Sequence, residues 1–167
     1  PNMNRVVTNY LQMMDETIQQ LCDLGCQRLG MVMTYTRKGG GNGRKLFLSS
    51  LFYYQSLIDS GKVVSFLPNR RPNVEGIREW MGQQRPDVVV SSARVKYMVE
   101  QLGYRIPEDI GFSSIDLSEE PHDLSGVDHR WDLVGIEAVK MLASQINGSE
   151  KGIPVEPRIV MVDSHFR

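Results

Sequence analysis

The sequence predicts an α/β fold, in which a mainly parallel β-sheet carries helices on both faces. Short apolar runs of strand length alternate along the 167 residues with longer segments of helical periodicity, and this alternation is the pattern of βα units. The run Val88-Val89-Val90 is continuously β-branched and is typical of a central parallel strand that is covered on both sides. Glycines follow several of the helical segments, at the positions where a glycine commonly ends a helix.

The first half of the chain opens with a short strand at 5–7. A helix is expected at 11–22, because apolar residues recur there every three or four positions and Gly25 follows as a C-cap. The apolar run 29–33 has the length of a strand. The next helix, at 44–59, is apolar on nearly all sides, so we expect it to be covered on more than one side.

The second half continues the alternation of strands and helices. Trp80 and Trp131 fall on apolar stripes of helical spacing, for which packing in the core is the expected role. Asp116 stands directly at the end of one of the expected strands. We expect strands at 63–67, 87–90, 110–115 and 158–162, and helices at 74–84, 95–102 and 130–146.

A ligand site is expected beyond the carboxyl ends of the parallel strands, in the loops 35–44, 67–73, 91–94 and 116–121. Asp116 ends a buried strand, where a carboxylate is costly unless it meets solvent, a backbone amide or a ligand. This carboxylate can accept hydrogen bonds from the hydroxyls of a sugar or from the donors of a base. The alternative is that Asp116 caps the following turn.

The glycine run 39–43 precedes the helix that begins at Arg44. Bare backbone amides at a helix start can bind phosphate, but this spacing matches neither common nucleotide-binding motif, and a flexible loop over a cleft explains the run as well. The Arg44 guanidinium could grip hydroxyls or a carboxylate in bidentate fashion. It could equally be a surface arginine.

Composition and spacing argue against several classes of function. The 19 Lys and Arg balance 20 Asp and Glu, giving a net charge of -1, so we expect no general attraction to a DNA backbone. No apolar run is long enough to cross a membrane and no signal peptide is evident, so a cytoplasmic protein is expected. The histidines and the pair Cys22 and Cys26 lack metal-site spacing. No catalytic group, metal or cofactor is predicted, and we expect no enzyme.

Several stretches resemble the lactose-repressor/galactose-repressor family of bacterial transcription regulators. The family pattern "PDAI…LG…VPEDVAVVGFD" is similar to RPDVVVSS at 85–92, LG at 102–103 and IPEDIGFSSID at 106–116. Two further pieces arrive in family order, DLGCQRLG at 23–30 and GVDH with VGIEAV between 126 and 139. The resemblance covers nearly the whole chain.

The resemblance implies a type I periplasmic-binding-protein-like core, in which two α/β subdomains enclose an effector cleft. Residues 1–125 would form most of the C-terminal subdomain, 126–155 a returning segment of the N-terminal one, and 156–167 a final strand that rejoins the C-terminal subdomain. A small-molecule effector would then change the affinity for operator DNA, which only an N-terminal helix-turn-helix outside these residues would contact. The family also implies a homodimer, formed through helix residues of the C-terminal subdomain. These include Val95, Met98, Val99 and Leu102, with Phe52 and Tyr53 as further candidates.

Arg44 and Asp116 resemble the cleft arginine and the cleft aspartate of the family. Where the family has Asn-Asp after the "PDAI" strand, this chain has Ala93-Arg94, which removes a common hydroxyl-binding amide. Arg94 and the loop arginines Arg70 and Arg71 suggest an anionic or strongly polar effector, unless they are exposed loop residues.

Two other functions stay open. A solute-binding protein of a transport system would share the same fold, and a signal peptide upstream would identify it. A flavodoxin-like or nucleotide-using enzyme would use the glycine run 39–43 to hold phosphate, and nucleotides or flavins would then stabilise it in a thermal-shift screen.

Overall fold

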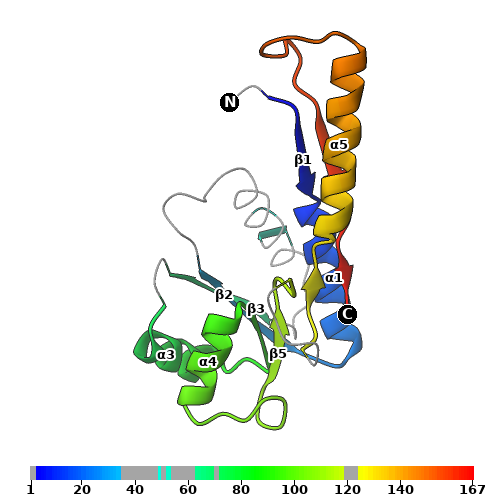
Figure 1. Ribbon diagram of the computed structural model, residues 1–167. Coiled ribbons are helices and arrows are strands. Elements are labelled where there is room, and N and C mark those ends of the chain that lie inside the picture. Colours follow the sequence, from blue (N-terminus) through cyan, green and yellow to red (C-terminus); the bar gives the residue numbers. More distant parts are fainter. Residues whose placement is uncertain (1–2, 35–48, 50–51, 54–62, 70–71, 119–123) are drawn as a thin grey trace.

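The computed structural model describes residues 3–34, 49, 52–53, 63–69, 72–118 and 124–167 (Figure 1). Of the helix expected at 44–59, only Ser49, Phe52 and Tyr53 fall within this part. The glycine run 39–43, Arg44, Arg70 and Arg71 lie outside the described residues.

Four parallel strands form the main sheet, in the order β3-β2-β4-β5. They are β2 (Arg28–Thr34), β3 (Val63–Asn69), β4 (Val88–Ser91) and β5 (Gly111–Ser114). All four were expected, and the valine run of β4 lies in the interior of the sheet, where both faces are covered. Parallel strands need such cover because their crossover connections place helices on the sheet.

Helices pack on both faces of this sheet (Figure 1). Helix α1 (Tyr10–Asp23) lies on one face, while α3 (Val74–Gln84) and α4 (Ala93–Gln101) lie together on the other. The predicted architecture of a parallel sheet between two helical layers is therefore confirmed. The α1 core consists of Met13, Met14, Ile18, Leu21, Leu29, Met31, Val88, Val90 and Val127. The α3/α4 core consists of Val32, Ile77, Trp80, Met81, Val89, Val95, Val99, Ile110 and Phe112.

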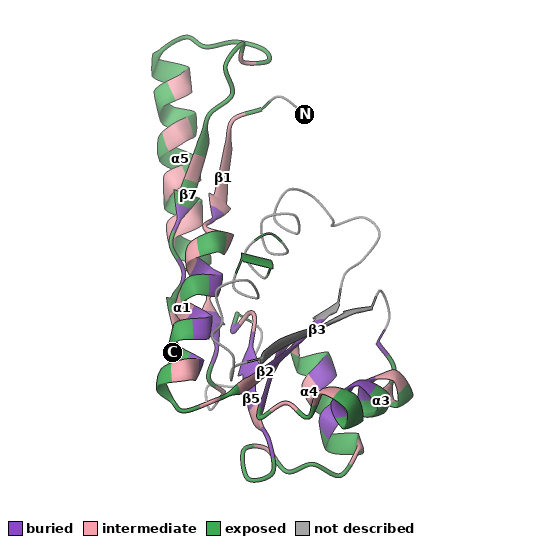
Figure 2. Cartoon of the chain, turned by 180° about the vertical axis from the view of Figure 1, so that it is seen from behind, coloured by how far each residue is buried: buried purple, intermediate pink, exposed green. Residues whose placement is uncertain are grey.

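A second, thinner body stands beyond the main sheet (Figures 1 and 2). It consists of β1 (Arg5–Thr8) and β7 (Ile159–Val162), which pair in parallel, and of helix α5 (Trp131–Asn147), which packs on them. Residues 156–167 were expected to rejoin the unit formed by residues 1–125; within them β7 pairs with β1, which lies in 1–125 but stands in the thinner body. The piece that returns to the larger body is β8 (His165–Phe166), which pairs with β6 (Val127–Asp128).

The chain crosses between the two bodies three times. It crosses after β1, between β6 and α5, and between β7 and β8. Just before β6, the backbone at Gly126 runs very close to β5, because a Cβ atom at this position would lie 2.2 Å from the Ser114 carbonyl oxygen. Only glycine lets the backbone approach β5 this closely.

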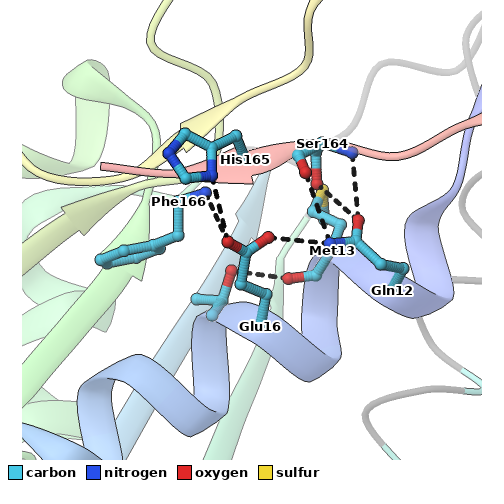
Figure 3. Close-up of polar contacts among 7 residues, drawn as sticks. Gln12, Met13, Glu16, Ser164, His165 and Phe166 are labelled. Carbon is cyan, nitrogen blue, oxygen red and sulfur yellow. Dashed lines mark hydrogen bonds and ion pairs between the residues drawn. The ribbon is translucent and has the colours of Figure 1, made fainter.

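A polar cluster fastens the last crossing to α1 (Figure 3). The side-chain oxygen of Gln12 accepts hydrogen bonds from the backbone nitrogen (3.0 Å) and the hydroxyl (3.1 Å) of Ser164. Glu16 accepts a hydrogen bond from the Phe166 backbone nitrogen at 3.1 Å, and its carboxylate lies 3.3 Å from His165 Nδ1. Gln12 also donates to Glu16 at 2.8 Å, so the two side chains hold each other in place.

Two expectations about apolar side chains are wrong. No residue of α5 is buried, and 48% of Trp131 is exposed, because the body that carries this helix is two strands wide in the described part of the chain. Val95 and Val99, expected at a dimer interface, are both 0% exposed within the α3/α4 core. They face their own sheet and cannot contact a partner.

Candidate functional site

The main sheet has a topological switch point between β2 and β4. The next strand, β3, lies on one side of β2, and β4 lies on the other side. Ligands in parallel α/β sheets bind beyond the carboxyl ends of the strands at such a switch point. Arg94 follows β4 and Asp116 follows the neighbouring strand β5.

The structure places Asp116 at this edge and holds its backbone firmly. The Ser114 hydroxyl donates to the Asp116 carbonyl oxygen at 2.9 Å, and the Asp116 backbone nitrogen lies 3.2 Å from the same hydroxyl. The Asp116 carboxylate accepts a hydrogen bond from the Ser118 backbone nitrogen at 2.9 Å. The turn-capping role is therefore present. It engages one carboxylate oxygen, Oδ1, of a side chain that remains partly exposed.

An aromatic cluster lies beside Asp116, at the crossings between the two bodies. The His129 ring stands between β6 and α5, with the Tyr10 ring edge-on at 6.1 Å between centroids and the Trp131 ring at 5.1 Å. Tyr10 begins α1 just after the crossing from β1, and Trp131 begins α5. The rings of Tyr10 and His129 thus lie within reach of the Asp116 charge, and the Trp131 ring lies against the His129 ring.

Electrostatics tie this cluster to Asp116. Burial lowers the pKa of His129, against the opposing effects of the Asp116 charge, a hydrogen bond to the Ile115 backbone and the Asp128 charge. Burial also raises the pKa of Tyr10, and the Asp116 charge adds to that effect. Both shifts favour neutral rings around a charged carboxylate.

The predicted site residues fare differently. Asp116 and Arg94 both lie at the expected edge, with Arg94 exposed in the first turn of α4. Arg44 and Arg71 lie outside the described residues.

Sequence reasoning missed Tyr10 and His129, and it assigned Trp131 to the core. The only available signal for His129 was its position directly after the strand-like Val127-Asp128. That signal does not reveal what the ring meets in space.

Within the described ranges, no group of three His, Cys, Asp or Glu residues is placed to hold a metal ion. Cys22 and Cys26 are free thiols, and burial raises the pKa of Cys26. Of the helices in this part of the chain, none has the length and apolar character needed to span a bilayer.

Comparison with known proteins identifies the fold. No protein-family model and no curated protein matches the sequence. Among solved structures, the chain is similar to a LacI-family transcriptional regulator from Enterococcus faecium with bound ribose, at 20% identity and a TM-score of 0.68. It is also similar to a periplasmic binding protein/LacI transcriptional regulator from Alkaliphilus metalliredigens complexed with D-xylulofuranose, at 12% identity and a TM-score of 0.74.

A third similar structure is a dimeric Lac repressor with an 11-residue C-terminal deletion, at 13% identity and a TM-score of 0.72. The matches cover 98% to 99% of this chain but only 62% to 64% of those three proteins. This chain therefore spans less than two thirds of their length. Its architecture is the periplasmic-binding-protein-like fold of LacI-family transcriptional regulators.

Proposed function

We propose that this chain is the effector-sensing part of a DNA-binding transcription regulator. A small polar ligand would bind at the edge formed by β4 and β5, and its binding would change the operator affinity of a separate DNA-binding segment. The observation that carries this proposal is the cluster of Asp116, Tyr10, His129 and Trp131, which lies where the chain crosses between the two bodies.

The position of the cluster provides a means of coupling. A ligand that contacts Asp116 of the larger body and Trp131 of the thinner one binds most tightly at one relative orientation of the two. Ligand binding therefore shifts the two bodies toward that orientation. The size of the shift is set by how much more tightly the ligand binds that orientation than the others. Rotation about the three crossings is the kind of motion that such a preference would drive.

The chemistry of the edge favours a sugar-like ligand. Asp116 offers a carboxylate to hydroxyl donors, and a half-exposed indole offers a flat apolar surface to a sugar ring. The similar structures contain ribose and D-xylulofuranose, and a further one is a regulator in complex with cellobiose. Arg94, together with Arg44 and Arg71 as predicted site residues, would add contacts to oxygens or to an anionic group.

The whole regulator would act as a cytoplasmic homodimer and would have no enzymatic role. One similar structure is a dimeric repressor, and two-fold symmetry suits a palindromic operator. The dimer contacts would come from surfaces other than Val95 and Val99, which lie inside the core. These 167 residues carry a net charge of -1, so we expect no sequence-dependent gel shift from them alone. A tight shift would contradict this assignment.

Calorimetric titration with D-ribose, D-xylulose, cellobiose and their phosphorylated analogues tests the proposed function. At least one of these ligands should bind, and Asp116→Ala should weaken that binding at least 10-fold, because a buried ligand hydroxyl would lose a charged acceptor. Asp15→Ala, an exposed carboxylate on α1, is the matched control and should bind normally. If none of these ligands binds, or if Asp116→Ala binds them as tightly as wild type, the proposed site is contradicted.

A further inference from the structure

A pocket of about 380 Å³ lies at the amino ends of β4 and β5, on the edge of the sheet opposite to the one that carries Asp116. This edge faces away from the thinner body (Figure 1). The pocket is bounded by the end of α3, the turn into β4 and the loop that leads from α4 into β5. Its volume falls within the range of small-molecule sites, which is about 300–1,000 Å³.

The interior of the pocket is apolar. Met81 and Ile110 line it, and each is 4% exposed as part of the α3/α4 core. Pro86 adds further apolar lining. Tyr104 also lines the pocket but is 39% exposed, so its side chain is accessible to a ligand from solution. A surface of this kind suits a flat apolar group, because such a group gains free energy by leaving water.

Gly82 lines the pocket from α3. A glycine inside a helix destabilises it relative to an alanine, and nothing lies within 4 Å of the position that a Cβ atom of Gly82 would occupy. The packing of α3 therefore does not require a glycine here. The missing side chain instead leaves the pocket open.

Arg85, directly after α3, shows the reverse choice. Its φ of 46° lies in the left-handed region, where glycine is the usual residue after a helix. The helix end does not need its side chain, because Arg28 Nε already donates to the carbonyl oxygens of Gln84 and Arg85 at 2.9 and 3.0 Å. In the described part of the chain, no hydrogen bond or ion pair engages the Arg85 guanidinium. This exposed group lines the pocket.

The charge available to a ligand at the pocket is that of Arg85 alone among the lining residues. Asp109 also lines the pocket, but Arg105 donates to both of its carboxylate oxygens, at 2.8 Å to Oδ2 and 2.6 Å to Oδ1. These hydrogen bonds lower the pKa of Asp109 to about 2, so the two charges stay paired at neutral pH. A free guanidinium binds a carboxylate through two parallel hydrogen bonds.

We propose that this pocket is a second ligand site, which binds a small carboxylic acid with a flat apolar body. The apolar body packs against Met81, Ile110 and Tyr104, and the carboxylate pairs with Arg85. Gly82 provides the room that the body needs. The site lies at the other edge of the sheet from Asp116, so this inference goes beyond the proposed effector site and does not depend on it.

The test is an NMR titration of the ¹⁵N-labelled 167-residue protein with phenylacetate. Amide signals of Met81, Tyr104 and Ile110 should shift and approach saturation at concentrations up to about 10 mM, while the signal of Asp116 should stay in place. Phenylacetamide has the same shape without the charge and should bind at least 10-fold more weakly. If phenylacetate shifts none of the three pocket signals, or if phenylacetamide binds equally well, the proposal is overturned.

Four variants locate the binding. Arg85→Gln should weaken phenylacetate binding at least 10-fold. Arg130→Gln is its matched control, because Arg130 is also exposed and left-handed, with a φ of 53°, and it should bind normally. Gly82→Leu should abolish binding by filling the pocket, whereas Asp116→Ala should bind as wild type does. Normal binding by Arg85→Gln or by Gly82→Leu, or loss of binding in Asp116→Ala, would overturn the proposal. Thermal unfolding establishes that each variant is folded.

Stability separates a ligand-binding role of Arg85 from a structural one. Arg85→Gly should raise the melting temperature by about 2–4 °C, because glycine adopts the left-handed conformation without strain. The same variant should weaken phenylacetate binding at least 10-fold. A lower melting temperature would show that the Arg85 side chain serves the fold, and the proposal would then be overturned.

Discussion

The absence of a side chain at Gly30 decides how the α3/α4 core packs. It is buried in β2, and a Cβ atom there would lie 2.5 Å from the Trp80 ring and 2.8 Å from the Pro86 Cβ. Trp80 can therefore pack flat on the strand only because this position has no side chain. The indole in turn covers the α3 side of the sheet.

Replacing Gly30 with alanine should destabilise the protein by about 1–3 kcal/mol, because the added methyl group must displace a buried ring. Urea unfolding measures the change. Gly82→Ala on α3 is the matched control, since nothing lies within 4 Å of its Cβ position. An alanine there should be neutral or should stabilise the helix by up to about 1 kcal/mol. Equal effects of the two substitutions would contradict the packing described for Trp80.

His129 should make stability depend on pH. Its folded-state pKa lies below the ordinary value of 6.5, so the unfolded chain binds the proton more readily. The resulting stability is fully present above pH 6.5 and is lost as the pH falls toward the folded-state pKa. Urea unfolding between pH 8 and pH 5 should show a smaller loss for His129→Asn than for wild type. Identical pH profiles would count against a buried neutral ring.

At the scale of the element, α1 anchors the chain where it returns from the thinner body. Asn9 caps the helix by accepting a hydrogen bond from the Gln12 backbone nitrogen at 3.4 Å. The Gln12 side chain then meets Ser164 through three hydrogen bonds, and Glu16 holds the next residues (Figure 3). One face of α1 thus packs in the core, while Gln12 and Glu16 on another face hold the last crossing.

Gln12→Leu should cost about 1–3 kcal/mol, because the buried backbone nitrogen and hydroxyl of Ser164 would lose their acceptor. Chemical unfolding gives the free energy, and hydrogen exchange should accelerate at 163–167. Gln19→Leu, at an exposed position of the same helix, should change stability by less than about 0.5 kcal/mol. If Gln12→Leu is as mild as this control, the polar cluster does not hold the crossing.

The two bodies of the molecule differ in how many apolar side chains they bury. The larger one buries two apolar clusters around four strands. The thinner one leaves α5 without a buried residue and exposes Val139, Leu142 and Ile146 on it (Figure 2). Local stability follows the density of buried contacts, so the two bodies should differ in how readily they open.

Hydrogen-exchange mass spectrometry on these 167 residues should show the difference directly. Amides of α5 should exchange well before those of β2 and β4, although both sets are hydrogen-bonded, because opening α5 exposes little new apolar surface. A destabilised variant such as Gly30→Ala should accelerate exchange in the sheet while leaving α5 nearly unchanged. If the amides of α5 and β4 were equally protected from exchange in wild type, the two bodies would not differ in local stability as described.

Much of the fold could be read from the sequence, since hydrophobic periodicity is a local property of the chain. The valine run of β4, the apolar spacing of α1 and the element order led to a parallel sheet with helices on both faces, and the structure has it. Asp116 could be placed at the carboxyl edge because it directly follows a strand. Periodicity also indicated an inward face for α5, but it could not indicate whether enough structure stood opposite to bury that face.

What the sequence alone determined is therefore the strands and helices around the main sheet and the edge at which a ligand is expected to bind. Tertiary structure decided the rest: that β7 pairs with β1, that Val95 and Val99 face inward, and that Tyr10, His129 and Trp131 gather beside Asp116. Tyr10 lies more than 100 positions from Asp116, His129 and Trp131 in the sequence, and only the chain crossings bring them together. Proximity of this kind depends on the path of the whole chain, which no local pattern encodes.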